Sequence, residues 1–292
     1  MSSSRFIIVT ADPRLVRLFL CLILFPMLFL SSASAFDRFT AHGGPVRDLA
    51  LSPDGQNFVT ASFDYSAVLW STNDIKEKLT LFGHEAALNT AKFSPDGRWL
   101  ATGGDDGLIM LWRTSELKQD DVEPIILRGH KGKIVHLAFS NESKQLASAS
   151  WDGSIGLWQL ENDPENTGVH SRFIRGHEGP VNAVQFSNDG DYLYSAGQDG
   201  QIRYWRLASD EYLRSVVRNG WGISVFAIDE TKDIVAFGSS DGVMSVERLS
   251  DQTTLMRVGD ERVPVLSLYH DDDAGVLGFG NAKGRVLLVD TS

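Results

Sequence analysis

The sequence predicts an all-β fold in which one unit of four short strands is repeated around a ring. Four tryptophans follow one another at separations of 42, 46 and 47 residues, and four histidines keep the same separations. Within most units, alternating β-type runs flank Asn-Asp-Gly, Pro-Asp-Gly or Asp-Gly turns. No stretch keeps a 3.6-residue apolar period over a dozen positions, so we expect few helices.

The composition disfavours several classes of protein. The 292-residue chain carries a net charge of −11, which disfavours binding to nucleic acid or to anionic lipid. Its single cysteine, Cys21, cannot form an internal disulfide, a cysteine-based zinc site, an iron–sulfur cluster or a c-type haem attachment. We therefore expect no cofactor, no metal site and no nucleic-acid partner.

The N-terminal segment has the pattern of an export signal. Three arginines precede a 13-residue apolar run over residues 18–30, and small residues follow at Ala33 and Ala35. The run is short for a membrane span, so a cleaved signal peptide over residues 1–35 is favoured over an uncleaved anchor. The mature chain, residues 36–292, is then periplasmic in a Gram-negative bacterium and secreted otherwise, with no stable membrane insertion.

Six units fill the mature chain. They span residues 36–72, 79–114, 125–160, 172–207, 214–249 and 256–291. Each of the first four carries a His, a Ser or Thr, an Asp and a Trp at constant offsets, with 22 residues from His to Asp and 6 from Asp to Trp. These sets are His42, Thr60, Asp64 and Trp70; His84, Thr102, Asp106 and Trp112; His130, Ser148, Asp152 and Trp158; and His177, Ser195, Asp199 and Trp205.

This pattern resembles the WD-repeat β-propellers, in which the four side chains form a hydrogen-bonded tetrad. The resemblance covers the whole mature chain and implies radial four-stranded blades. Counting on by 42 residues, the last two units lose the tetrad, with Asn219, Phe237, Asp241 and Glu247, then Glu261, Phe279, Lys283 and Val289. The two phenylalanine rings should replace the polar network by apolar packing. Six blades are favoured over an incomplete seven-bladed ring.

Closure of the ring follows from the same resemblance. In the family, each sequence unit opens with the outer strand of the preceding blade. Residues 36–41 should therefore pair with Val286–Val289 and complete the last blade, which removes an exposed sheet edge.

The residue types of a hydrolase are present, but their repetition favours a structural role. A Ser or Thr, a His and an Asp recur four times with Trp as the last member, whereas a nucleophile is needed once. We therefore expect no catalytic residue. The acidic run Asp271–Asp273 could bind calcium, but an exposed turn is favoured because six or more oxygens must converge on that ion. His136, His170 and His270 are expected to be partly exposed rather than ligands.

The resemblance also implies where a partner binds. In the family, three positions in each blade commonly contact partners on one face. In the first four blades the candidates are Arg47, Phe63, Asn89, Asp105, Lys133, Trp151, Asn182 and Gln198, beside Pro45, Ala87, Val135 and Pro180. Phe63 and Trp151 stand out, because aromatic anchors dominate interface energetics.

These observations favour an exported, non-catalytic scaffold that binds another protein. The chain is similar to bacterial exported WD-repeat proteins, some of which continue into a c-type cytochrome domain. It has no Cys-x-x-Cys-His motif, so the resemblance implies no haem function for this chain. The resemblance does suggest a place beside an electron-transfer or envelope complex. The alternative is a propeller enzyme, a lactonase or quinoprotein-like dehydrogenase, with acidic and histidine side chains at the channel mouth.

Overall fold

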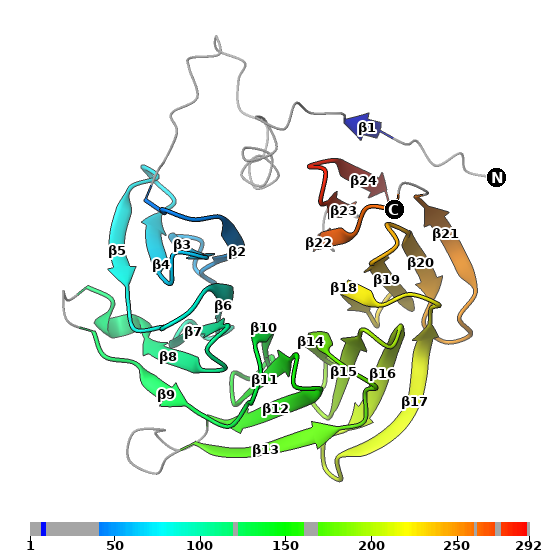
Figure 1. Cartoon of the computed structure of the whole chain (residues 1–292), viewed down its shortest axis with the longest axis horizontal. Helices are drawn as coiled ribbons and strands as arrows, with labels where there is room; N and C mark the ends of the chain where they lie inside the picture. Colours follow the sequence, from blue (N-terminus) through cyan, green and yellow to red (C-terminus); the bar gives the residue numbers. More distant parts are fainter. Residues whose placement is uncertain are drawn as a thin grey trace.

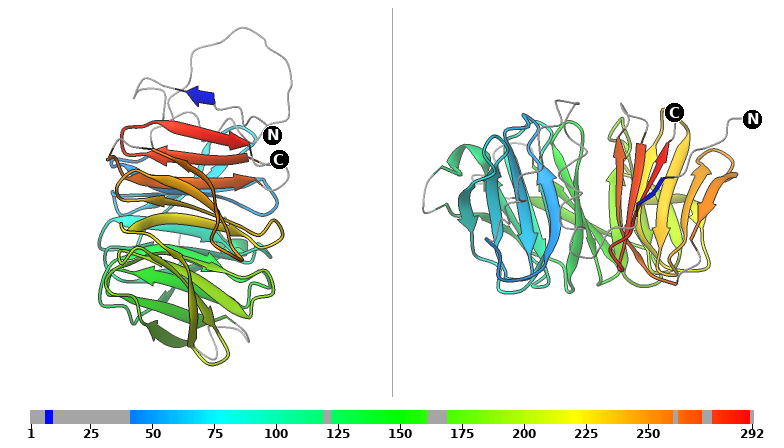
Figure 2. Two further views of the ribbon diagram at one scale, coloured as in Figure 1. Left: turned by 90° about the vertical axis from the view of Figure 1, so that its right-hand side faces the viewer. Right: turned by 90° about the horizontal axis from the view of Figure 1, so that it is seen from above.

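The computed structural model describes residues 7–9, 41–118, 122–160, 169–259, 262–271 and 276–290. They form six four-stranded antiparallel sheets, or blades, arranged around a central channel (Figure 1). The two side views show a disc, with the strands running between its two faces (Figure 2). The prediction of an all-β propeller with six blades is confirmed.

The first five blades are meanders of consecutive strands ordered from the channel outward, and in the sixth blade the consecutive strands β22, β23 and β24 are followed by β1 from the N-terminal part of the chain. The blades are β2 (Val46–Leu51), β3 (Asn57–Ser62), β4 (Ala67–Ser71), β5 (Glu77–Leu81); β6 (Leu88–Phe93), β7 (Trp99–Gly104), β8 (Ile109–Arg113), β9 (Ile125–Leu127); β10 (Ile134–Phe139), β11 (Gln145–Ser150), β12 (Ser154–Gln159), β13 (His170–Arg175); β14 (Val181–Phe186), β15 (Tyr192–Gly197), β16 (Gln201–Arg206), β17 (Glu211–Arg218); β18 (Ile223–Asp229), β19 (Ile234–Ser239), β20 (Met244–Arg248), β21 (Thr254–Val258); and β22 (Val265–Asp271), β23 (Val276–Asn281), β24 (Val286–Asp290), β1 (Ile7–Val9). A 3-10 turn, η2 (Thr114–Glu116), follows β8.

Short turns explain why the strands are short and close in sequence. Between β6 and β7, the Ser94 hydroxyl donates to the Asp96 carboxylate at 2.6 Å, and the Gly97 N–H donates to the Ser94 carbonyl at 2.9 Å. Gly97 has a φ of +72°, which a glycine adopts without the steric cost of a side chain. The sequence of this turn therefore sets the hairpin register.

A β-bulge recurs in every inner strand. The pairing register shifts immediately after the first residue of β2, β6, β10, β14, β18 and β22. One extra residue in a strand bends it and redirects the neighbouring side chains. In blades two to six, the first inner-strand residue is at most 1% exposed: Leu88, Ile134, Val181, Ile223 and Val265.

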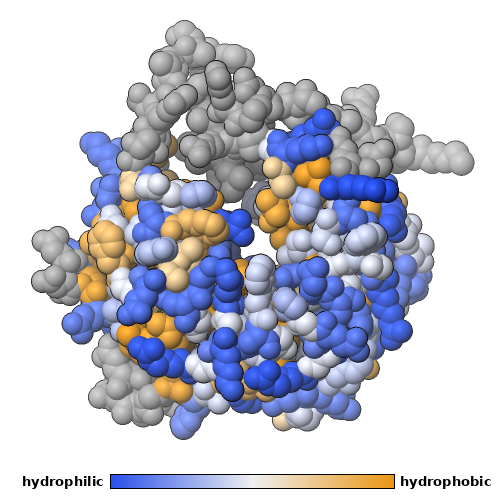
Figure 3. Space-filling model, in the orientation of Figure 1, coloured by the Kyte–Doolittle hydropathy of each residue, from blue (hydrophilic) through white to orange (hydrophobic). Residues whose placement is uncertain are grey.

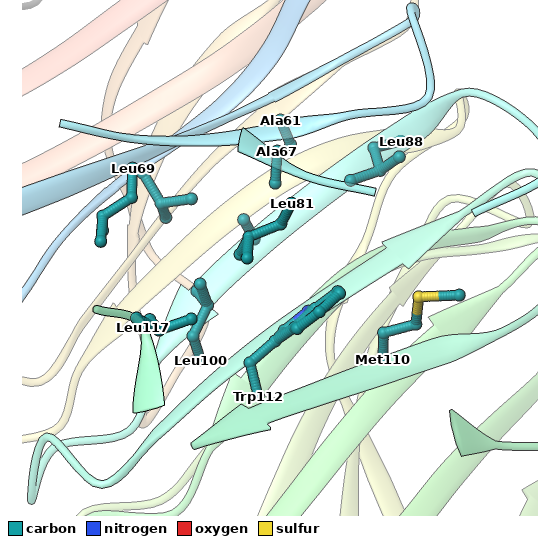
Figure 4. Packing of buried hydrophobic residues seen from close by; sticks show 11 residues of the cluster. Ala61, Ala67, Leu69, Leu81, Leu88, Leu100, Met110, Trp112 and Leu117 are labelled. Carbon is teal, nitrogen blue, oxygen red and sulfur yellow. The ribbon is translucent and has the colours of Figure 1, made fainter. Parts of the chain in front are cut away.

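The core is divided among the interfaces between blades. Five hydrophobic clusters each join two consecutive blades, from the first pair to the fifth. In the cluster between blades one and two, Leu88 of β6 packs in one group with Ala61 and Ala67 of the first blade, close to Trp112 and Met110 (Figure 4). A branched or long apolar side chain against a small residue lets two sheets approach closely.

The sixth interface differs from the other five. Each of the first five blades packs its inner and second strands against the inner strand of the next blade. Within the described strands, β22 and β23 do not pack in this way against β2, and Figure 1 shows the gap between β2 and the strands β22–β24. In the part of the chain that the structure describes, the six blades thus form a ring with one opening, between the last blade and the first.

The prediction that residues 36–41 form the outer strand of the sixth blade is wrong, because other residues occupy that place. The outer strand of the sixth blade is β1, with Ile7, Ile8 and Val9 opposite Leu288, Leu287 and Val286. Three consecutive β-branched residues have high strand propensity, and β24 otherwise presents an unpaired edge. Residues 36–40, predicted for this place, lie outside the described residues, as does most of the predicted signal segment.

Candidate functional site

The structure brings together all four side chains of each tetrad. In the first blade, His42 Nδ1 lies 2.9 Å from the Asp64 carboxylate and Nε2 lies 2.8 Å from the Thr60 hydroxyl, to which Trp70 Nε1–H donates at 2.8 Å. The corresponding distances are 2.8, 2.9 and 3.2 Å around His84, 3.0, 2.7 and 2.9 Å around His130, and 3.0, 2.7 and 2.7 Å around His177. The network links the loop before the inner strand to the second and third strands.

The tetrad carboxylates remain ionised down to low pH. Burial raises the pKa of Asp64, but hydrogen bonds from Ser66, the Gly43 N–H and His42 outweigh it and lower the pKa from 3.8 to about 2. Opposing effects of the same kind lower the pKa of Asp152 and of Asp199 to about 2. The carboxylate therefore accepts a hydrogen bond from Nδ1–H of the histidine, whose Nε2 faces the hydroxyl.

The tetrads are built as internal ties rather than as exposed reactive groups. The hydroxyl residues Thr102, Ser148 and Ser195 are 0% exposed, and each hydroxyl also contacts a tryptophan ring nitrogen. A substrate cannot reach an oxygen enclosed in this way. In the described residues, no group of three or more His, Cys, Asp or Glu side chains is placed to hold a metal ion. Asp272 and Asp273 lie outside them.

Blades five and six have a phenylalanine at the position that the tetrad serine or threonine occupies in the first four blades. Phe237 and Phe279 are buried, each in the cluster of its own interface. Asp241 keeps its place in the turn, where it accepts the Ser239 hydroxyl and the Val243 N–H. Burial raises the pKa of Glu247, at the tryptophan position. Val289 is buried and Lys283 is exposed, while Glu261 lies outside the described residues.

The face that carries the tetrad turns, here called the tetrad face, presents the two predicted aromatic side chains. Phe63 and Trp151 are 41% and 51% exposed. Their backbone N–H groups donate to Pro45 and Lys133, so each turn is tied to the loop before the inner strand of its own blade. The Arg47 guanidinium lies 5.2 Å from the Phe63 ring centre, and the Lys133 ammonium 5.5 Å from that of Trp151.

Two predicted contact residues make hydrogen bonds inside the molecule. The Asn89 side-chain amide donates to the Ile134 carbonyl at 3.0 Å and to Asp105 at 2.8 Å, and that of Asn182 donates to the Ile223 carbonyl at 2.8 Å. These amides tie the inner strand of one blade to the next. Asp105 also pairs with Lys133, and Gln198 is exposed beside Gly222.

Sequence reasoning missed three exposed aromatic residues on the tetrad face. Tyr65 is 51% exposed in the same turn as Phe63, Phe82 is 71% exposed in the loop before β6, and Trp221 is 62% exposed in the loop before β18. Trp221 stands outside the 42- to 47-residue series of tetrad tryptophans, which was the available signal. The face therefore carries an aromatic set of five residues: Phe63, Tyr65, Phe82, Trp151 and Trp221.

Comparison with known families agrees with this geometry. The family model described as "WD domain, G-beta repeat" matches residues 34–71, 75–113, 123–159 and 168–206, together just over half of the chain. The four matched segments are the four units that carry a tetrad, and the two blades that lost it are not matched. The chain belongs to the WD40 repeat family.

Proposed function

We propose that this protein is an exported, non-catalytic scaffold that binds another protein through its tetrad face. WD40 propellers are commonly protein-interaction scaffolds, and the rigid disc holds its loops in fixed positions. The observation that carries the proposal is the aromatic set on one face. Solvent-exposed aromatic rings are costly to leave uncovered, and such residues are enriched at protein interfaces.

Trp151 is the residue on which the partner should depend most. Its ring is half exposed and faces the Lys133 ammonium, which is fixed by its ion pair with Asp105. An aromatic ring held in one orientation loses little entropy on binding. Basic and aromatic groups side by side suit a partner segment with both acidic and apolar side chains.

Replacing Trp151 with alanine should weaken partner binding about 10- to 30-fold while leaving the fold intact. The partner is captured from the native envelope fraction with the wild-type protein, and its affinity is then measured for both variants. Leu255→Ala is the matched control, because Leu255 is 49% exposed but lies on the outer strand β21. Equal affinity of the Trp151 variant and the control would place the interface elsewhere.

Export is the second part of the proposal and rests on the N-terminal sequence. In the described residues, no helix has the length and apolar character needed to cross a membrane. Cleavage after Ala35 would remove β1 from the outer edge of the sixth blade. We expect a mature N-terminus at Phe36 in protein recovered from outside the cytoplasm, measured by intact mass. A protein that retains Met1 there would contradict the cleavage.

A further inference from the structure

Among the described residues, no blade packs against the apolar side chains that line the opening between blades one and six. On the first blade, Val46 is 50% exposed, whereas its counterparts at the start of the other five inner strands are at most 1% exposed. Leu49, on the same side of β2, is half-buried, whereas its counterparts Ala91 and Leu137 are fully buried. This side of blade one thus carries the same kinds of apolar residue as the interfaces between blades, but these residues are not buried.

The facing side of blade six also has unfilled space where the other blades contact their neighbours. Gly280 occupies the position of Gly103 and Gly238, where an added Cβ would meet Ile134 or Val265 of the next blade. At Gly280 the one described residue that an added Cβ would meet is Ser267, which belongs to the same blade. Val286 and Leu288 are half-buried, whereas their counterparts in the second blade, Ile109 and Leu111, are buried. The space-filling view also shows apolar residues of blade six beside the opening (Figure 3).

A backbone N–H of the first blade also bonds differently from its counterparts at the filled interfaces. Between blades one and two, the Asp48 carboxylate accepts the Ala91 N–H at 3.0 Å, and between blades three and four His136 accepts the Val184 N–H at 3.5 Å. The matching N–H of blade one, on Leu49, donates to Asp48 of its own strand at 2.9 Å. The Leu49 N–H therefore bonds within its own blade, whereas the N–H groups of Ala91 and Val184 bond to the preceding blade.

The five filled interfaces explain why the ring does not close on itself. Each repeats the same contact, an apolar residue at the start of one inner strand against an Ala or Gly of the preceding blade, and so sets a similar rotation between blades. Five such steps leave Val46 out of contact with Gly280. Direct closure would require all five packed interfaces to spread, and close-packed interfaces resist such deformation.

We propose that this opening binds a blade-like β-sheet element of another protein. The occupant that fits presents a branched aliphatic residue to Gly280 and an Ala or Gly to Val46, as every internal interface does. The facing sides of blades one and six are the two walls of the opening, and the inner strands of both blades line the same channel. A single inserted element can therefore contact both walls at the same time. This surface is separate from the tetrad face, and the two proposals can fail independently.

The first experiment tests whether the opening persists in solution. In a chain with Cys21→Ser, we expect the pair Val46→Cys and Gly280→Cys to keep free thiols under mild oxidation. The matched pair is Gly103→Cys with Ile134→Cys, because a Cβ built on Gly103 lies 3.4 Å from the Ile134 Cβ, within reach of a disulfide. Equally complete oxidation of the first pair within one chain shows a ring closed on itself and overturns the proposal.

The second experiment identifies the occupant. A photo-reactive amino acid is placed at Val46 or at Leu288, one on each wall, in cells that make the protein, with Leu255 as the exposed control. We expect both wall positions to cross-link to the same second protein, through neighbouring strands that carry a branched aliphatic residue and an Ala or Gly, while Leu255 does not. Links between two copies of this chain, links to its own N-terminal residues, or no link would each overturn the proposal.

Two variants of Gly280 with side chains of different size test whether the cross-linked protein packs against this glycine. Gly280→Leu should reduce cross-linking from position 46 by about tenfold or more, because it fills the space that the occupant enters. Gly280→Ala carries the same Cβ against Ser267 but matches the alanine found at three of the filled interfaces, so it should keep the adduct. Equal adducts in both variants would contradict packing at Gly280.

Discussion

Replacing Asp152 with alanine is expected to lower the free energy of unfolding by about 3 kcal/mol. The carboxylate accepts hydrogen bonds from His130, from the Lys131 N–H and from the hydroxyl and N–H of Ser154. The His130 side chain is 0% exposed, so its Nδ1–H would keep only the longer contact to the Ser154 hydroxyl, at 3.2 Å, without gaining water. Denaturant unfolding of the wild type and the variant measures the difference.

The fifth blade supplies a matched control for this experiment. Asp241 occupies the same repeat position, but among the described residues its donors are Ser239 and Val243, and Asn219 stands at the histidine position. Asp241→Ala should therefore cost about 1 kcal/mol, the usual value of a turn hydrogen bond. If Asp152→Ala cost no more than Asp241→Ala, the tetrad would not be the structural tie described above.

Between pH 7 and pH 4 the protein should lose about 3 kcal/mol of stability through His136 alone. Burial, together with the nearby Lys92 charge, lowers the pKa of His136 from 6.5 to about 4. The folded state therefore keeps this histidine neutral where the unfolded chain binds a proton. The contribution is complete above pH 6.5 and is lost as the pH falls toward 4.

The Thr found at the same position of blade two provides the comparison. The variant His136→Thr copies Thr90, so the titrating group is gone while a small polar side chain remains on the inner strand. Unfolding free energies measured from pH 7 to pH 4 should fall less steeply in this variant than in the wild type. The tetrad carboxylates interfere little, since the pKa values of Asp64, Asp152 and Asp199 are lowered to about 2 and that of Asp106 is lowered as well, so their contribution is lost mainly below about pH 4. Parallel pH profiles would contradict the assignment to His136.

The tetrads and the blades could be predicted because their signals are local and repeated. His42, Thr60, Asp64 and Trp70 stand at fixed offsets within one unit, and hairpin turns fix which strands pair. The structural role of the tetrad hydroxyls also followed from their repetition. The predicted apolar replacement by Phe237 and Phe279 agrees with their places in the hydrophobic clusters.

Closure and surface exposure depend on relations that no single unit contains. Val46 and Leu88 have the same local pattern, yet one is half exposed and the other buried, because the difference lies in whether a preceding blade is present. The strand that pairs with β24 is likewise decided by competition between distant segments, and Ile7–Val9 holds that place. The hydrogen bond from the Asn89 amide to the Ile134 carbonyl of the next blade could not be read from the sequence for the same reason.

The opening also changes how the molecule should come apart. A closed propeller has no terminal repeat, so no blade can unfold without breaking two interfaces. Here blades one and six each have one packed neighbour, and the molecule resembles a short linear array with two ends. Unfolding can then begin at either end and proceed blade by blade, with the middle blades the last to lose protection. An element bound in the opening would abolish both ends at once and make the disc unfold as a single cooperative unit.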